Sequence, residues 1–220
     1  MSDGSSSKWA EMRAEYVRDG LYEADLEPDP TKMFQRWMSD AVAAGLPEPN
    51  AMVLSTVSEE CRPSARMVLL KGLDEWGFVF YTNLLSRKGV QLAGNPACSL
   101  LFPWHPIQRQ VRVEGIASQL LREDVAVYFA GRPRGAQLGA WASHQSSPVA
   151  SRAELEAAYA AAETRYPESI EVPVPPEWGG YAVRPSLVEF WQGRRDRLHD
   201  RLVYRRTDDA DLWTIERLAP

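Results

Sequence analysis

The stretch that decides the fold contains five short apolar segments: AMVLSTV (51–57), SARMVLLKGL (64–73), FVFYT (78–82), ACSLLF (97–102) and VRVEGIAS (111–118). They are rich in β-branched, aromatic and other apolar residues, and most are separated by short polar turns, which is typical of β-strands joined by hairpins. Strands spaced so closely along a chain predict an antiparallel barrel or sandwich.

Helical patterns surround these strands. From Thr31 onward, apolar residues recur at three- and four-residue intervals and predict a helix that closes at Gly45 and Pro47. We expect further helices over residues 86–95, 122–130, 137–142 and 151–166, and further strands over residues 180–191, 201–206 and 212–218. The predicted fold class is therefore mainly β with helices (α+β), with the helices placed around one β-barrel.

The first 30 residues differ from the rest of the chain. They begin with a polar, Ser-rich segment that lacks the apolar core of a signal peptide. Between Asp19 and Asp29 there are five acidic residues and no Lys or Arg, which favours a linker. We expect a mobile arm and linker over residues 1–30 and a single domain over residues 31–220.

Composition excludes several classes of protein. The 220 residues are 45% hydrophobic and 25% charged, close to the average for globular proteins. Only two cysteines, Cys61 and Cys98, are present, and no Cys or His spacing fits a metal site. A net charge of −5 argues against a general nucleic-acid binder, and no apolar run is long enough to cross a membrane. We expect a cytoplasmic protein without a bound metal.

Cations on the predicted strands are the first candidates for a binding site, because the common nucleotide, metal and esterase motifs are absent. Arg66 and Lys71 lie on one predicted strand and should face opposite sides, so an anion is expected to neutralise whichever faces the core. Arg87 and Lys88 follow Ser86 at a predicted helix start, where free N–H groups favour a phosphate. The alternative is that these cations, with Arg109 and Arg112, are solvated ends of strands and helices.

Two further segments have unusual compositions. Residues 128–148 combine Arg132 and Arg134 with glycines, hydroxyls and amides, which suits either a loop around an anionic ligand or an ordinary connection between helices. Residues 189–206 are rich in Arg and also contain Trp191 and His199. That segment is either a solvated basic face, a nucleic-acid patch, or a loop that presents Arg197 and His199 together.

Residues 189–206 carry a specific resemblance to a known family. The sequence Glu189-Phe190-Trp191-Gln192-Gly193, followed after three residues by Arg197-Leu198-His199-Asp200-Arg201, resembles the signature of the pyridoxine (pyridoxamine) 5′-phosphate oxidase family, FMN enzymes of vitamin B6 metabolism. Other matching blocks follow in the family's order: Arg66–Lys71, Phe80–Asn83, Ser86–Lys88, Leu101–Trp104, Arg109–Val111, Arg132–Arg134, Gly139–Trp141 and Trp178–Gly180.

The resemblance implies a split antiparallel β-barrel homodimer that binds two FMN molecules between its subunits. It implies FMN contacts by Arg66, Met67, Val68, Leu69, Leu70, Lys71, Tyr81, Thr82, Arg87, Lys88, Gln110, Gln145, Ser146, Trp191 and Arg201. It implies substrate contacts by Arg13, Tyr16, Lys71, Tyr128, Arg132, Arg197, Leu198 and His199, with Lys71, Tyr128 and Arg132 on the substrate phosphate and Arg197 and His199 as catalytic residues.

The implied activity is oxidation of pyridoxamine 5′-phosphate or pyridoxine 5′-phosphate to pyridoxal 5′-phosphate, with oxygen reduced to hydrogen peroxide. The chain departs from the family at Gly135-Ala136-Gln137, where a phosphate-binding serine is common, and in its acidic stretch after Asp19. The alternatives are a similar flavin oxidase for another ring such as a phenazine precursor, a non-catalytic flavin- or pyridoxal-phosphate-binding protein, and a nucleic-acid binder that uses the arginines of residues 194–206.

Overall fold

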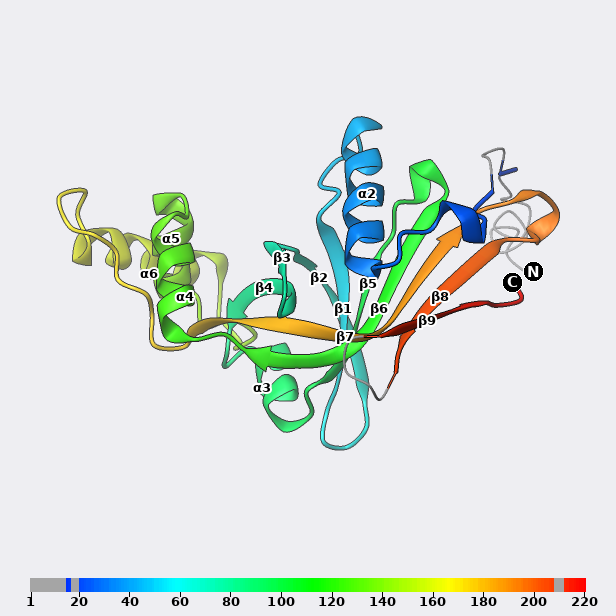
Figure 1. Cartoon of the computed structure of the whole chain (residues 1–220). Helices are drawn as coiled ribbons and strands as arrows, with labels where there is room; N and C mark the ends of the chain where they lie inside the picture. The colour runs from blue at the N-terminus through cyan, green and yellow to red at the C-terminus, as the bar shows by residue number, and fades with distance from the viewer. Residues whose placement is uncertain (1–14, 17–19, 208–211) are drawn as a thin grey trace, which may run out of the picture. The chain divides into compact units, whose positions relative to one another are not determined.

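The computed structural model describes residues 15–16, 20–207 and 212–220 (Figure 1). Contacts within the chain define two compact units. Unit 1 combines the described residues up to Pro49 with Pro103–Arg112 and the chain from Leu187 onward, and unit 2 comprises Asn50–Phe102 and Val113–Ser186. The expected arm over residues 1–30 falls partly outside the described residues, so that division of the chain stays a prediction.

Unit 2 is built on an antiparallel sheet. Its strands are β1 (Ala51–Val57), β2 (Pro63–Leu69), β3 (Gly72–Asp74), β4 (Gly77–Asn83) and β5 (Ala97–Phe102), with parts of β6 (Arg109–Gln119) and β7 (Trp178–Gln192). They follow the order β2-β1-β5-β6-β7-β4-β3. The inward residues of β1, such as Met52 and Leu54, are fully buried, and their alternation with half-buried residues explains why the period-two pattern predicted this strand.

The predicted single strand over residues 64–73 is wrong. The chain leaves the strand at Leu70 and Lys71, so β2 and β3 are separate elements. The backbone N–H of Leu70 donates to the carbonyl of Asn50 (2.8 Å), whereas the N–H of Lys71 donates to the carbonyl of Val79 (2.8 Å). Consecutive residues thus bond to different parts of the sheet, β2 pairing with β1 and β3 with β4, and the expectation that Arg66 and Lys71 face opposite sides of one strand fails.

Helices complete unit 2. Helix α3 (Arg87–Gly94) begins after Ser86, whose hydroxyl accepts from the N–H of Gly89. Helices α4 (Arg122–Ala130), α5 (Arg134–Ala142) and α6 (Arg152–Arg165) lie together in Figure 1 and enclose a core that includes Phe129, Leu138 and Trp178. Helix α5 begins three residues before its predicted start.

Unit 1 contains helix α2 (Pro30–Ala43), which begins where the Asp29 carboxylate accepts from the N–H of Thr31 (2.8 Å). Trp37 of this helix is buried with its ring edge-on to Phe190 (centroids 5.1 Å apart). The remaining elements are the end of β7, strands β8 (Asp200–Arg206) and β9 (Trp213–Arg217), and the short turns η1 (Glu23–Asp25), η2 (His105–Ile107) and η3 (Arg195–Arg197). Over the described residues, no helix combines the length and the apolar character needed to cross a membrane.

Two helical glycines offer a matched test of packing in unit 2. A Cβ at Gly89 in α3 would lie 2.2 Å from the carbonyl oxygen of Leu84, whereas a Cβ at Gly139 in α5 would meet nothing within 4 Å. In the interior of a helix, alanine is more favourable than glycine by about 1 kcal/mol in intrinsic helix propensity. We expect Gly139→Ala to raise the free energy of unfolding by up to about 1 kcal/mol, and Gly89→Ala to lower it by about 1–3 kcal/mol because the backbone must shift. Urea unfolding of the two variants measures this, and equal effects would contradict the close packing at Gly89.

Candidate functional site

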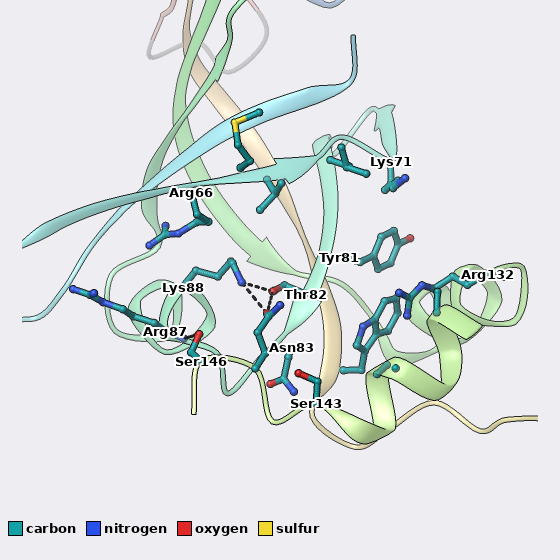
Figure 2. Close-up of a pocket in the computed structure, with 18 of the residues that line it drawn as sticks. Arg66, Lys71, Tyr81, Thr82, Asn83, Arg87, Lys88, Arg132, Ser143 and Ser146 are labelled. Atoms are coloured by element: carbon teal, nitrogen blue, oxygen red, sulfur yellow. Dashed lines mark hydrogen bonds between the residues drawn. The ribbon is translucent and has the colours of Figure 1, made fainter. Parts of the chain in front are cut away.

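A pocket of about 810 Å³ opens in unit 2, a volume typical of small-molecule sites. Its walls come from β2, from the end of β4 and the start of α3, from α4 and α5, and from the segment around Gln145. None of its lining residues is acidic. Figure 2 shows cations at two sides of this pocket, with Arg66, Arg87 and Lys88 on one side and Lys71 and Arg132 on the other.

The first cation group consists of Arg66, Arg87 and Lys88, and its Arg66 lies on strand β2. Its guanidinium donates to the hydroxyl of Thr56 (2.6 Å), the carbonyl of Leu54 (3.1 Å) and the hydroxyl of Ser64 (2.6 Å). All of these acceptors are neutral oxygens. The contacts hold the guanidinium in place but leave its positive charge uncompensated.

Lys88 belongs to the same group, lies at the start of α3, and is only 8% exposed. Its ammonium donates to the side-chain oxygen of Gln145 (2.8 Å) and to the hydroxyls of Thr82 (3.0 Å) and Ser86 (3.3 Å), two of the contacts drawn in Figure 2. Burial, and secondarily the charge of Arg66, lowers the pKa of Lys88 to about 8.

No carboxylate among the described residues pairs with Arg66 or Lys88. Burial and the nearby charge of Arg87 lower the pKa of Arg66. Arg87 adds an exposed cation at the first turn of α3, where the helix dipole also favours negative charge. The half-buried Arg66 on β2 and the buried Lys88 at the start of α3 repel each other, and such a pair of cations suits a dianion such as a phosphate.

Three residues that support Arg66 were not predicted from the sequence, namely Thr56, Ser64 and Gln91. The hydroxyls of Thr56 (2.6 Å) and Ser64 (2.8 Å) both donate to the side-chain oxygen of Gln91 on α3. Thr56 is fully buried and Gln91 nearly so. A hydroxyl on the otherwise apolar inward face of β1 was the signal in the sequence that could have indicated this network.

The second cation group lies at the other side of the pocket. It consists of the cations Lys71 and Arg132, together with the phenol of Tyr128. Lys71 is exposed, while one terminal nitrogen of Arg132 (Nη1) is buried without a hydrogen-bond partner. Burial lowers the pKa of Arg132, and burial raises the pKa of the Tyr128 phenol against the opposing effect of Arg132. A buried, unsatisfied guanidinium nitrogen indicates a place for an anionic ligand.

Backbone and side chains of β2 lie between the two groups. Met67, Val68 and Leu69 line the pocket, and Met67 is 58% exposed. Leu70 is buried and is not among the lining residues, because the chain turns out of the strand there. The structure thus brings together these predicted site residues of unit 2: Arg66, Met67, Val68, Leu69, Lys71, Tyr81, Thr82, Arg87, Lys88, Tyr128, Arg132, Gln145 and Ser146.

The other predicted site residues belong to unit 1. Tyr16 stands edge-on to Trp191 (centroids 5.9 Å apart) and to His199 (5.4 Å). The Nδ1 atom of His199 accepts from the backbone N–H of Arg194 (3.1 Å), so the neutral ring carries its proton on Nε2. Burial and the charge of Arg197 lower the pKa of His199, which favours this neutral form.

Arg197 and Leu198 are exposed next to this aromatic cluster in sequence, and the backbone of Arg197 has a positive φ of 61°. Arg201 is held internally, because its guanidinium donates twice to the carboxylate of Glu189 (2.8 and 3.1 Å) and once to the carbonyl of Ala219 (3.0 Å). Gln110 also lies in unit 1, on β6. The predicted substrate contact Arg13 lies outside the described residues.

The candidate cations Arg109 and Arg112 do not line the pocket, and they form ion pairs and are not the solvated ends that the alternative described. Arg109 donates to the carboxylate of Asp40 (2.6 Å) and lies over the ring of Trp37 (4.3 Å). Arg112 pairs with Glu189 (2.6 Å). Both cations therefore have acidic partners within unit 1, unlike the cations that line the pocket of unit 2.

An antiparallel sheet that carries a pocket with cations at two sides, and Met67, Val68 and Leu69 between them, has the composition that suits phosphorylated ligands. Comparison with known proteins gives the family. Residues 38–166 match the family model of pyridoxamine 5′-phosphate oxidase, and residues 178–220 match the pyridoxine 5′-phosphate oxidase C-terminal dimerisation region. The chain belongs to the pyridoxamine 5′-phosphate oxidase family, a family of oxidoreductases.

Individual relatives cover nearly the whole chain. A pyridoxine/pyridoxamine 5′-phosphate oxidase of Nocardioides sp. is 65% identical over 96% of this chain and 97% of its own length. One of Salinibacter ruber is 54% identical over 97% and 100%. The crystal structure of PhzG from Burkholderia lata 383 in complex with tetrahydrophenazine-1-carboxylic acid is 31% identical, with a TM-score of 0.85 over 92% of this chain and 98% of that one. The predicted fold class, an antiparallel split barrel with helices, is confirmed.

The pKa of Lys88 leads to a test of the first cation group. A bound anion favours the charged ammonium, so affinity should fall as pH rises through about 8 and Lys88 loses its proton. Sulfate keeps its charge over this range and serves as the probe in calorimetric titrations from pH 7 to pH 9.5. We expect Lys88→Arg to remove the pH dependence, and Lys88→Met to weaken binding about tenfold or more at pH 7. Equal sulfate affinity of the unsubstituted protein at both pH values would contradict the assignment.

Proposed function

We propose that the protein is an FMN-dependent oxidase of vitamin B6 metabolism that converts pyridoxamine 5′-phosphate or pyridoxine 5′-phosphate to pyridoxal 5′-phosphate. Oxygen is the electron acceptor and leaves as hydrogen peroxide. The observation that carries this proposal is the presence of two separate cation groups in one pocket, one for a cofactor phosphate and one for a substrate phosphate. The names of the close relatives support it.

The residues of the first group fit FMN. Arg66, Arg87 and Lys88 would hold its phosphate, since their charges have no acidic partner among the described residues of the pocket. The flavin ring would lie along Met67–Leu69 with Tyr81, Thr82, Gln145 and Ser146 nearby. The chemistry that bound FMN supplies is two-electron oxidation at the C4′ carbon of the substrate.

The second group would bind the substrate phosphate through Lys71, Tyr128 and Arg132. The free Nη1 of Arg132 offers a donor there. Ala136 also lines the pocket and supplies no hydroxyl, so the charged donors carry this contact. Remote binding of the phosphate would hold the pyridine ring in a reactive orientation.

Arg197 and His199 would orient the substituent on C4′. His199 is suited to donate a hydrogen bond from Nε2, because its Nδ1 already accepts from the backbone of Arg194. Its lowered pKa keeps the ring neutral at pH 7. For the amine substrate, C4′ loses two electrons and a proton, and water then replaces the nitrogen, which leaves as ammonia.

The family's dimerisation region supports a homodimer in which both subunits contact FMN. Trp191, Arg197, His199 and Arg201 all fall within that region. We expect light scattering to give twice the monomer mass of 24.8 kDa. A monomer that retains its flavin would overturn this part of the proposal.

A second candidate is an oxidase for a phenazine-type ring, which is favoured by the similarity to PhzG crystallised with tetrahydrophenazine-1-carboxylic acid. Such a substrate offers a carboxylate in place of a phosphate. It would use the first cation group but would not require Lys71, Tyr128 and Arg132 together. A location in the cytoplasm stays a prediction.

Steady-state kinetics with oxygen uptake separates the two candidates. We expect turnover of pyridoxamine 5′-phosphate with peroxide release, and a kcat/KM for unphosphorylated pyridoxamine lower by a hundredfold or more, because the phosphate contacts are lost. Equal use of both compounds would move the phenazine-type candidate to first place. Absence of turnover by the flavin-loaded protein would favour a binding protein.

Two substitutions divide binding from chemistry. Lys71→Ala should raise the KM for pyridoxamine 5′-phosphate about tenfold or more with little change in kcat, since one charged contact is lost. Arg197→Ala should instead lower kcat by orders of magnitude and leave flavin content unchanged. Kinetics and flavin absorbance of the purified variants measure both effects, and a loss of flavin from Arg197→Ala would contradict its placement on the substrate.

A further inference from the structure

We propose that Trp178 is a positioning residue that fixes the guanidinium of Arg132 for the substrate phosphate, and that Tyr81 does the same for the phenol of Tyr128. This inference rests on the proposed function and deepens it, because it names what gives the site its selectivity for a phosphorylated substrate. Trp178 carried no expected role as a site residue from the sequence.

The positioning surface is a flat floor formed by Tyr81 and Trp178. The register of β4 and β7 pairs Tyr81 with Gly180 and Asn83 with Trp178, so Tyr81 and Trp178 are diagonal neighbours on one face of the sheet. Their rings are nearly parallel (4°), with centroids 5.4 Å apart. A Cβ at Gly180 would lie 2.8 Å from the Tyr81 ring, so this glycine lets the ring lie across the strand.

The two substrate-binding groups lie on this floor. The ring of Tyr128 stacks on Tyr81 with centroids 3.8 Å apart and planes 3° from parallel. The guanidinium carbon of Arg132 lies 4.7 Å from the centroid of the Trp178 ring. One aromatic face therefore supports the phenol and the other supports the cation.

The floor itself is held rigidly. Trp178 is 6% exposed and packs edge-on against Phe129 (centroids 4.9 Å apart). Arg122 donates to the carbonyls of Trp178 (2.7 Å), Val174 (2.8 Å) and Pro175 (2.9 Å), which fixes the chain where it enters β7. The indole plane is thus set by the core of unit 2 before any ligand binds.

An aromatic partner suits a phosphate-binding arginine better than a carboxylate does. A carboxylate uses the N–H donors, as Glu189 and the carbonyl of Ala219 do for Arg201. A ring attracts the face of the guanidinium and leaves its N–H edge free. This accounts for a half-buried Arg132 whose buried Nη1 has no hydrogen-bond partner.

The test compares Trp178→Leu with Trp178→Phe. Trp141→Leu serves as a matched control, because Trp141 packs against the same hydrophobic cluster but contacts Tyr166 and lies under the guanidinium of Arg165. We expect Trp178→Leu to raise the KM for pyridoxamine 5′-phosphate about tenfold and to leave kcat/KM for unphosphorylated pyridoxamine within about twofold. Trp178→Phe keeps an aromatic face and should stay within about threefold of the unsubstituted protein, as should Trp141→Leu.

Calorimetric binding of pyridoxal 5′-phosphate to the flavin-loaded variants gives a second readout that does not depend on turnover, with the same order of affinities expected. Equal weakening toward the phosphorylated and unphosphorylated compounds, or equal effects of Leu and Phe at position 178, would overturn the positioning role. If Trp178→Leu does not fold, Trp178→Met takes its place with the same tenfold rise in KM for pyridoxamine 5′-phosphate expected, and an equal loss of phosphate preference in Trp178→Met and Trp141→Leu would overturn the role. If the unsubstituted protein shows no phosphate preference, the proposed function fails instead.

Discussion

The repulsion between the half-buried Arg66 and the buried Lys88 is the constraint on which the pocket of unit 2 depends. The acceptors around these cations are neutral oxygens supplied by β1, β2, β4, the start of α3 and the segment at Gln145. Neutral oxygens can solvate a cation but cannot cancel its charge. The fold therefore maintains an unbalanced positive site, which an anionic ligand stabilises when it binds.

The distribution of acidic residues, and not their number, separates this pocket from the rest of the molecule. The chain carries a net charge of −5, yet none of the residues lining the pocket is acidic. In unit 1 several of the described arginines have carboxylate partners, as Arg109 has in Asp40 and Arg112 has in Glu189. Arginine thus forms internal ion pairs in one unit, whereas in the other it lines a pocket without an acidic residue.

Local patterns predicted most of the secondary structure, because alternation and helical spacing record which side of an element is buried. They could not predict the break at Leu70 and Lys71, since the two N–H groups bond to acceptors far away in the chain. They also missed Trp178 beneath Arg132, which depends on the register between β4 and β7. Motifs identified Arg66 and Lys88 as candidates, but only the packed structure shows the support from Thr56 and Gln91.

The two ends of the pocket hold their cations in different ways, and this difference supports their assignment. At the first end, Lys88 is buried and three neutral oxygens fix its ammonium, so a ligand there loses most of its contact with water and should dissociate slowly. At the second end, Lys71 is exposed and Arg132 rests on an aromatic face with donors still free. A ligand there would bind to preorganised groups without breaking an ion pair. This contrast supports the proposal that a resident cofactor occupies the first end and an exchanging substrate the second.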